Sequence, residues 1–154
     1  MGSWLMRLRA GEKPAGPPRT VRSFGAGERP LTSSSVSRDG DAWRIEAHEE
    51  GSVALFEVDE PGVEACMLSY RASLKTADAS GVYLEMWCRI PGRGEFFSKG
   101  LRQVLKGTRD WSSQEITFLL RKGQRPDLVK LNVTFKGAGT IWMKDIELLQ
   151  TPLK

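Results

Sequence analysis

The sequence predicts an all-β sandwich or barrel, and three observations lead to this prediction. Short segments alternate apolar and polar residues with the period of two that a strand requires. Clusters of Gly, Asp and Pro separate these segments at the spacing of strands and turns, a rhythm that is typical of all-β domains. No segment repeats its apolar residues at the spacing of a long amphipathic helix.

The length and composition predict one soluble domain behind a short leader. A chain of 154 residues is long enough for one domain that buries roughly 70% of its unfolded surface, and too short for two ordinary domains. Residues 1–20 are rich in Gly and Pro, which predicts a flexible leader or linker, and residues 21–154 then form the single domain. No apolar run approaches the ~18 residues of a membrane-spanning helix.

The net charge of +4 does not indicate a nucleic-acid-binding protein. Residues 1–30 contain six basic and two acidic residues, so the whole excess lies there, and residues 31–154 carry 17 basic and 17 acidic residues. A nucleic-acid site gathers its basic residues on a folded face. We therefore expect no nucleic-acid partner.

The individual elements follow from the alternation of apolar and polar residues. Strands are predicted at 21–24, 43–48, 52–58, 63–75, 81–90, 95–98, 116–120, 129–136 and 140–149. Loops are predicted at 25–41, 76–81 and 121–127, and a turn at 107–111. Cys66 and Cys88 fall on the apolar side of their strands, which favours two buried thiols, and the single His48 falls on a polar side. One histidine excludes histidine-based zinc sites.

The most informative segment is the strand predicted at 81–90. Its core side is expected to be Val82, Leu84, Met86, Cys88 and Ile90. Its outer side then combines two aromatic rings with a carboxylate and a guanidinium: Tyr83, Glu85, Trp87 and Arg89. The C–H faces of a sugar ring stack on aromatic rings, and its hydroxyls need planar polar partners. The pattern predicts a glycan site here, to which neighbouring strands would add Arg71 and Asn132.

Two alternatives stay open for these aromatic residues. A loop or the leader would cover the face, with Trp87 filling a second small core and Glu85 paired to Arg71 or Arg89. Trp111 either closes one end of the core or offers a further exposed platform for stacking.

The last third of the chain resembles the galactose-binding-like jelly rolls, which include many bacterial carbohydrate-binding modules. The resemblance covers roughly residues 68–148. It rests on the turn Gly107-Thr108-x-x-Trp111, the pair Pro126-Asp127 before a Val-x-Leu-x-Val strand, and the closing motif Gly-x-Gly-Thr-Ile-Trp-x-x-Asp-Ile-x-Leu. It implies a jelly-roll β-sandwich of two antiparallel sheets, with sugar bound on a sheet face or at the loops of one end.

Many members of that group also hold a structural calcium ion. Their closing strand often has two adjacent acidic residues where this chain has Lys144 and Asp145. Asp145 is therefore the one calcium ligand that the resemblance implies, and no other cofactor is predicted. Further oxygen donors would come from the acidic residues Asp39, Asp41, Glu46 and Glu147.

The favoured function is that of a non-catalytic domain that binds a glycan. The alternative is a protein-interaction or assembly module of the same fold, because Arg, Trp and Tyr are also enriched at protein interfaces. A less favoured alternative is a glycosidase or lyase, in which Glu95 or Glu115 would lie near Glu85 as the second carboxyl group. We expect an extracytoplasmic protein if it binds sugar and a leader was removed, and a cytoplasmic one otherwise.

Overall fold

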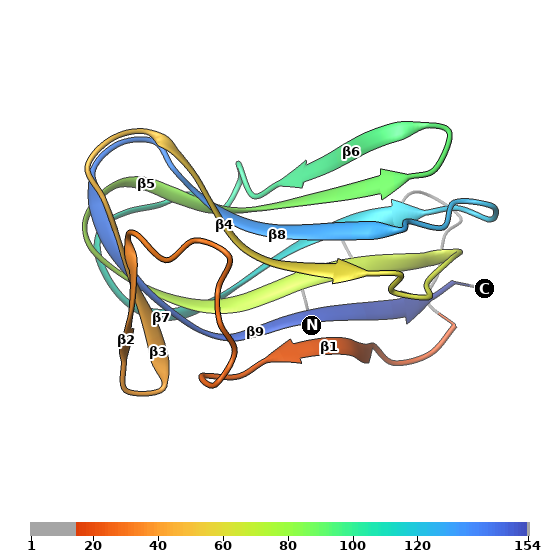
Figure 1. Cartoon of the computed structure of the whole chain (residues 1–154), viewed down its shortest axis with the longest axis horizontal. Coiled ribbons are helices and arrows are strands. Elements are labelled where there is room, and N and C mark those ends of the chain that lie inside the picture. The colour runs from red at the N-terminus through yellow and green to blue at the C-terminus, as the bar shows by residue number, and fades with distance from the viewer. Residues whose placement is uncertain (1–14, 154) are drawn as a thin grey trace.

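The computed structural model describes residues 15–153, and these contain nine strands and no helix (Figure 1). The strands are β1 (Arg19–Phe24), β2 (Val36–Asp39), β3 (Ala42–Ala47), β4 (Gly51–Asp59), β5 (Cys66–Ile90), β6 (Gly94–Lys99), β7 (Leu105–Leu120), β8 (Leu128–Phe135) and β9 (Gly139–Pro152). Every strand pair is antiparallel. The all-β prediction is confirmed.

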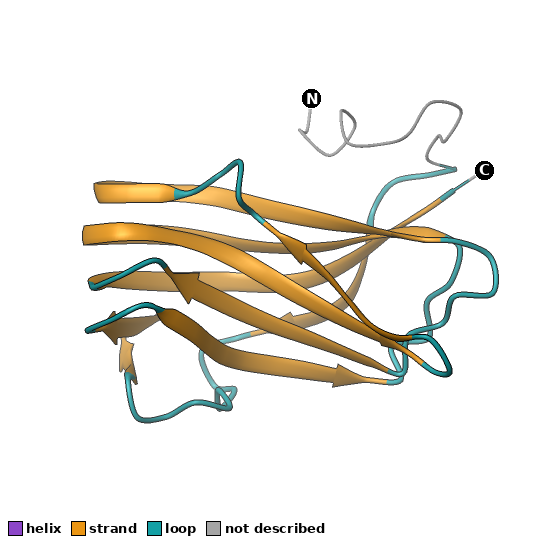
Figure 2. Cartoon of the chain, turned by 90° about the horizontal axis from the view of Figure 1, so that it is seen from above, coloured by secondary structure: helices purple, strands orange, loops and turns teal. Residues whose placement is uncertain are grey.

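The strands form two layers of a β-sandwich, which the long strand β5 joins (Figure 2). In the first layer, here called the β9 layer, β9 lies between the first half of β5 on one side and β3 and β1 on the other, with β2 and β7 at the edges. In the second layer, the β8 layer, the order is β4, β8, the second half of β5, and β6. The predicted antiparallel jelly-roll sandwich is confirmed, with the difference that β5 joins the two layers into one continuous sheet.

The continuity of β5 corrects the loop predicted at 76–81. The register with β7 shifts three times between Leu74 and Val82, and Asp78 takes a left-handed conformation with φ of 50°. Extra residues of this kind bend a strand without ending its ladder. The chain therefore passes from one layer to the other as a strand, although its small and polar residues are typical of a loop.

Two further predictions about the elements were wrong. The turn predicted at 107–111 lies inside β7, where Gly107 has φ of 79° and pairs with Ala79 in the bend of β5. The loop predicted at 25–41 contains β2, an exposed four-residue strand on the edge of β3. Its residues carry little apolar alternation, so the sequence offers no signal for it.

The core between the layers is built from the inward residues of both. Val82, Leu84, Met86, Cys88 and Ile90 are all buried, so the predicted core side of 81–90 is confirmed. Trp43 and Tyr70 are buried there too. Cys66 and Cys88 are free and buried, and burial raises the pKa of their thiols to about 11 and about 12. Burial thus makes them small apolar residues at neutral pH.

The ends of the chain leave part of the domain prediction untested. Residues 1–14 and 154 lie outside the described residues, and with them most of the leader predicted at 1–20. β1 begins at Arg19, two residues before its predicted start. Within residues 15–153 we find no helix that is long and apolar enough to cross a membrane.

Candidate functional site

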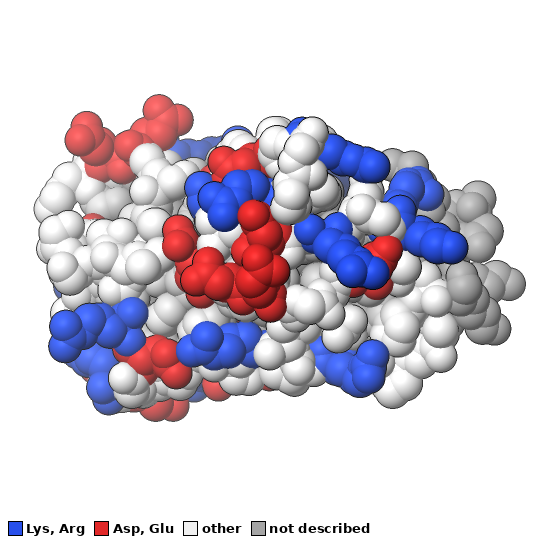
Figure 3. Space-filling model, turned by 45° about the vertical axis from the view of Figure 1, so that its right-hand side comes forward, with Lys and Arg blue, Asp and Glu red and all other residues white. Residues whose placement is uncertain are grey.

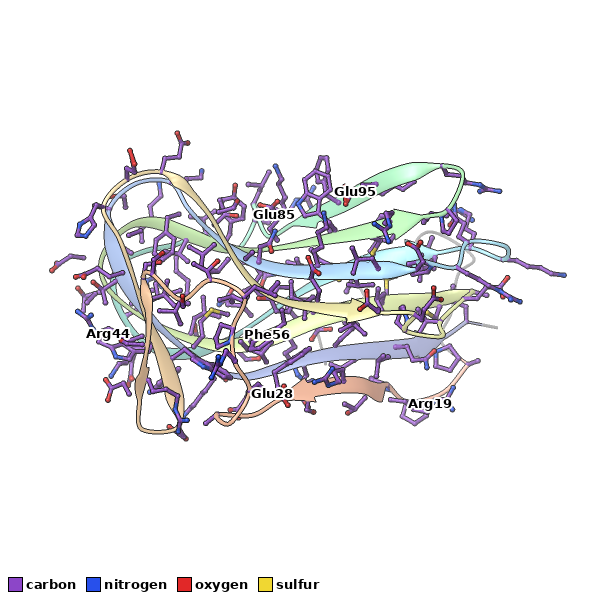
Figure 4. The ribbon with its side chains drawn as sticks, in the orientation of Figure 1. Arg19, Glu28, Arg44, Phe56, Glu85 and Glu95 are labelled. Atoms are coloured by element: carbon purple, nitrogen blue, oxygen red, sulfur yellow. The ribbon has the colours of Figure 1, made fainter. Side chains whose placement is uncertain are left out.

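The outward side of the β8 layer, here called the β8 face, collects the residues that the sequence singled out. Directly opposed residues of antiparallel strands share one face. The rows across the strands are Ser52, Thr134 and Tyr83; then Asn132, Glu85 and Lys99; then Glu57, Lys130, Trp87 and Phe97; then Asp59, Leu128, Arg89 and Glu95. Figure 4 labels Glu85 on β5 and Glu95 on β6 in the upper part of the view. Tyr83, Glu85, Trp87, Arg89 and Asn132 are therefore neighbours.

Glu85 lies beneath this face rather than on it. Only 5% of the residue is exposed, and both of its carboxylate oxygens accept hydrogen bonds. The hydroxyls of Thr134 and Ser52 donate to Oε1 at 2.6 and 3.1 Å, and the indole N–H of Trp87 donates to Oε2. The expected pairing of Glu85 with Arg71 or Arg89 does not occur, because Arg71 contacts Glu147 and Arg89 contacts Asp127.

The hydrogen bonds decide the charge state of Glu85. Burial by itself raises the pKa of this carboxyl group, because a low-dielectric surrounding disfavours the ion. The donors Thr134, Trp87 and Ser52 favour the ion and outweigh burial, so that the pKa lies below its usual value of 4.5. Glu85 is therefore an anion at neutral pH that holds one indole and two hydroxyls in place.

Trp87 and Phe97 form an aromatic pair on the β8 face. Their ring centroids are 5.1 Å apart and their planes are inclined by 53°. Trp87 is half-buried, whereas 53% of Phe97 is exposed, and the ammonium of Lys99 lies 4.8 Å from the centroid of the Phe97 ring. Phe97 is open to solvent and Trp87 partly so, and among the described residues no loop covers the pair completely.

Phe96, the neighbour of Phe97, points to the other side of β6. Its ring centroid lies 6.4 Å from that of Phe118 on β7. The two phenylalanines therefore lie on different surfaces, and only Phe97 lies beside Trp87 on the β8 face.

The charged groups of the β8 face mostly pair with one another. Arg89 Nε lies 2.8 Å from Asp127 Oδ1, and Lys130 Nζ lies 2.9 Å from Glu95 Oε1. On the side of the molecule seen in Figure 3, acidic and basic side chains are interspersed and form no continuous basic field. The Tyr83 hydroxyl and the Asn132 amide, by contrast, are partly exposed and have no hydrogen-bond partner among residues 15–153.

The structure separates Arg71 and Trp111 from this group. Both lie in the β9 layer, Arg71 on the first half of β5 and Trp111 on β7. Because the outer faces of a sandwich point away from each other, neither residue shares a surface with Trp87. Trp111 is half-buried and is not part of the core, so its predicted role as a plug was wrong. Glu115, opposite Arg71, is likewise distant from the β8 face.

Asp145 lies in the middle of β9, between the part that pairs with β3 and the part that pairs with β1, in a left-handed conformation with φ of 54°. It lines a hollow of about 520 Å³ together with Asp41, Glu147 and Arg71, and the Arg71 guanidinium lies 2.8 Å from Glu147. Within the described part of the chain no three acidic, histidine or cysteine side chains are grouped closely enough to hold a metal ion. Calcium at Asp145 therefore stays a prediction.

The other candidate residues from the sequence lie outside the β8 face. His48 is exposed, as predicted. Asp39 accepts a hydrogen bond from the Trp142 indole, and Glu46 lies 3.6 Å from Arg44. Sequence reasoning missed the part that Ser52 and Thr134 play, since only the register of β4, β8 and β5 brings them to Glu85.

The fold is similar to that of solved carbohydrate-binding modules. The CBM22-1 xylan-binding domain from Paenibacillus barcinonensis Xyn10C superposes with a TM-score of 0.59 at 7% identity, over 90% of this chain and 98% of that domain. A CBM4 structure gives a TM-score of 0.55 at 12% identity, over 84% of this chain and 78% of the other. The family 29 module CBM29_1 from Piromyces equi gives 0.52 at 12% identity, over 92% of both chains.

Comparison of the sequence, by contrast with the fold, gives no such relatives. No protein-family model matches it, and no curated protein does. The resemblance inferred from the closing strands is thus confirmed at the level of the fold.

Proposed function

We propose that this protein is a non-catalytic module that binds a neutral glycan on the β8 face. The observation that carries the proposal is the aromatic pair of Trp87 and Phe97, whose indole a buried carboxylate holds in position. A binding surface that is ordered before the ligand arrives loses less entropy on binding. The sugar ring would stack on this pair through its C–H face.

The polar groups beside the rings support a sugar rather than a purely apolar ligand. The Tyr83 hydroxyl and the Asn132 amide have no hydrogen-bond partner among the described residues. Both groups can donate to and accept from sugar hydroxyls. The charges of the face favour a neutral ligand. Arg89 and Lys130 are already paired with carboxylates, and the remaining cation of the rows, Lys99, is matched by the exposed carboxylate of Glu57 in the row of Trp87.

The state of Glu85 supports a binding role over a catalytic one. Acid and base hydrolysis of a glycoside needs one carboxyl group with a raised pKa, which stays protonated near neutral pH. The pKa of Glu85 is lowered instead, and its oxygens are occupied by three donors. Glu95, one of the two carboxylates that the sequence offered as a partner of Glu85, pairs with Lys130 instead. Neither group fits the general acid of a glycosidase.

The solved neighbours suggest the first ligands to test. One is described as a xylan-binding domain, and a family 29 module with a TM-score of 0.51 was solved with cellulohexaose. Soluble xylan and cellulohexaose are therefore the probes, and isothermal titration calorimetry is the measurement. We expect the parent protein to bind at least one of them.

Variants then locate the site. Trp87→Ala and Phe97→Ala are expected to weaken binding by about tenfold or more, since each removes part of the stacking surface. Trp111→Ala, the same kind of truncation on the other layer, is the matched control and is expected to bind like the parent. A folded Trp87→Ala protein with undiminished affinity, or a parent that binds neither probe but captures a protein or dimerises, would contradict the proposal.

A further inference from the structure

A second aromatic surface lies on the opposite side of the sandwich, on the outward side of the β9 layer, here called the β9 face. One row crosses four strands: Arg44 on β3 is opposite Trp142 on β9, which is opposite Lys75 on β5, next to Trp111 on β7. Neighbouring strands are about 4.8 Å apart, so the row is about 14 Å long. In Figure 4, Arg44 marks this row at the left end, away from Glu85.

Cations and indoles alternate along this row. The Lys75 ammonium lies 4.8 Å from the ring centroid of Trp142 and 5.7 Å from that of Trp111. The Lys144 ammonium lies 4.4 Å from the Trp111 ring, and the Arg44 guanidinium carbon 5.9 Å from the Trp142 ring. All four distances are within the range of cation–π attraction, which keeps these positive groups on the surface of the rings.

The two lysines of the row have no anionic partner among residues 15–153. Arg44 has Glu46 at 3.6 Å, but neither Lys75 nor Lys144 forms an ion pair or donates a hydrogen bond to a described side chain. Cation–π attraction does not involve an oxygen acceptor for the ammonium N–H groups. The three hydrogen-bond donors of each lysine therefore stay available to a ligand. Two unpaired ammonium groups close to the Trp111 ring fit the carboxylates of a ligand.

We propose that the β9 face is a second binding site, which takes an acidic polysaccharide whose sugar units carry carboxylates. The carboxylates would pair with Lys75 and Lys144, and the sugar rings would lie against the exposed parts of Trp111 and Trp142. This site is independent of the β8 face, since the two outer faces of a sandwich point in opposite directions.

The composition of the β9 face favours a polysaccharide over other polyanionic partners. The centre of a protein interface is apolar, yet the exposed large apolar side chains of the described residues lie elsewhere, in the loop before β2, on β6 and in the turn after it: Leu31, Phe96, Phe97 and Leu101. Nucleic acids need a wider basic field, whereas carboxylates border this row at Asp39 and Glu46.

The test is calorimetric titration of the full chain with polygalacturonate at low salt. We expect binding by the parent and a loss of about tenfold in the double variant Lys75→Gln with Lys144→Gln, because two ion pairs disappear while the side-chain stems remain. Lys122→Gln with Lys136→Gln removes the same charge from positions outside the row and is expected to leave the affinity unchanged. Trp87→Ala is also expected to bind polygalacturonate like the parent.

Two control ligands test which part of the polysaccharide is recognised. Polyglutamate offers carboxylates without sugar rings, and single-stranded DNA offers a polyanion without carboxylates. Trp111→Ala is expected to weaken binding of polygalacturonate but not of polyglutamate, because only the former has rings to stack. The proposal is overturned if the parent does not bind polygalacturonate, if the lysine double variant binds it equally well, or if polyglutamate or single-stranded DNA binds as tightly.

Discussion

Each outer face of the sandwich holds a tryptophan whose indole N–H donates to a carboxylate, but the two carboxylates lie in different surroundings. Glu85, the partner of Trp87, is buried and accepts from Ser52 and Thr134 as well. Asp39, the partner of Trp142, is exposed and accepts at 2.9 Å. A hydrogen bond in a low-dielectric network is stronger than one in water. The indole on the β8 face is thus held by a buried carboxylate, and the one on the β9 face by a solvated carboxylate.

The largest effect on stability is expected when the Glu85 carboxylate is removed. Glu85→Ala leaves an indole and two hydroxyls without their buried acceptor, so the free energy of unfolding should fall by about 3 kcal/mol. Urea denaturation measures this loss. Glu85→Gln retains one carbonyl acceptor and is expected to lose less. Equal stability of the parent and Glu85→Ala would show that the network does not stabilise the β8 layer.

The two binding reactions are expected to differ in how their affinities depend on salt. Carboxylates paired with Lys75 and Lys144 near the surface are screened, so the affinity for polygalacturonate should fall by about tenfold as salt rises from low to high. Binding of xylan or cellulohexaose at Trp87 and Phe97 involves no ion pair and should stay constant. Calorimetry at two salt concentrations measures both, and a parallel response of the two ligands would mean that they share a site.

Acid is expected to affect the β8 face through Glu85. Its pKa in the folded protein is lower than the usual 4.5, so ionised Glu85 stabilises the fold above that value, and this contribution is lost as the pH falls through the folded-state pKa. Glu85→Gln has no such group to titrate. The stability difference between the parent and Glu85→Gln should therefore be largest at neutral pH and shrink below 4.5, as followed by urea denaturation across the pH range. A constant difference would exclude the ionised network.

The smallest effect is expected at Asp39. Because this carboxylate is exposed, water replaces it as the acceptor for the Trp142 indole, and Asp39→Ala should cost less than about 1 kcal/mol in the free energy of unfolding. The same denaturation experiment is the measurement. A loss as large as that of Glu85→Ala would remove the contrast between the two faces.

Local patterns predicted much of this structure from sequence. The alternation at 81–90 correctly assigned Val82, Leu84 and Met86 to the core, because side-chain direction in a strand depends only on position along it. The bend of β5 was missed because Asp78, Ser80 and Gly81 are typical of a loop, whereas the pairing of Ala77 with β9 and of Ala79 with β7 continues the ladder through them.

Contacts between distant segments were harder to predict. Glu85 was expected at the surface, but Ser52 and Thr134, 33 and 49 residues away, enclose it. Arg71 was grouped with Trp87 because 63–75 and 81–90 were predicted as separate strands that could be neighbours, whereas they belong to one strand, β5, which crosses between the layers. Trp111 was predicted in a turn, whereas it lies on β7 beside the first half of β5. Asp39 and Trp142 are 103 residues apart, and no local pattern joins them.

The most direct test of the β8 face is to follow the five tryptophan indole N–H resonances by NMR during titration with the neutral glycan that the protein binds. We predict that the Trp87 resonance shifts in proportion to saturation, together with the Asn132 side-chain amide, while those of Trp111 and Trp142 stay in place. Saturation with the Trp87 resonance unmoved, and with shifts confined to Trp111 or Trp142, would contradict the account.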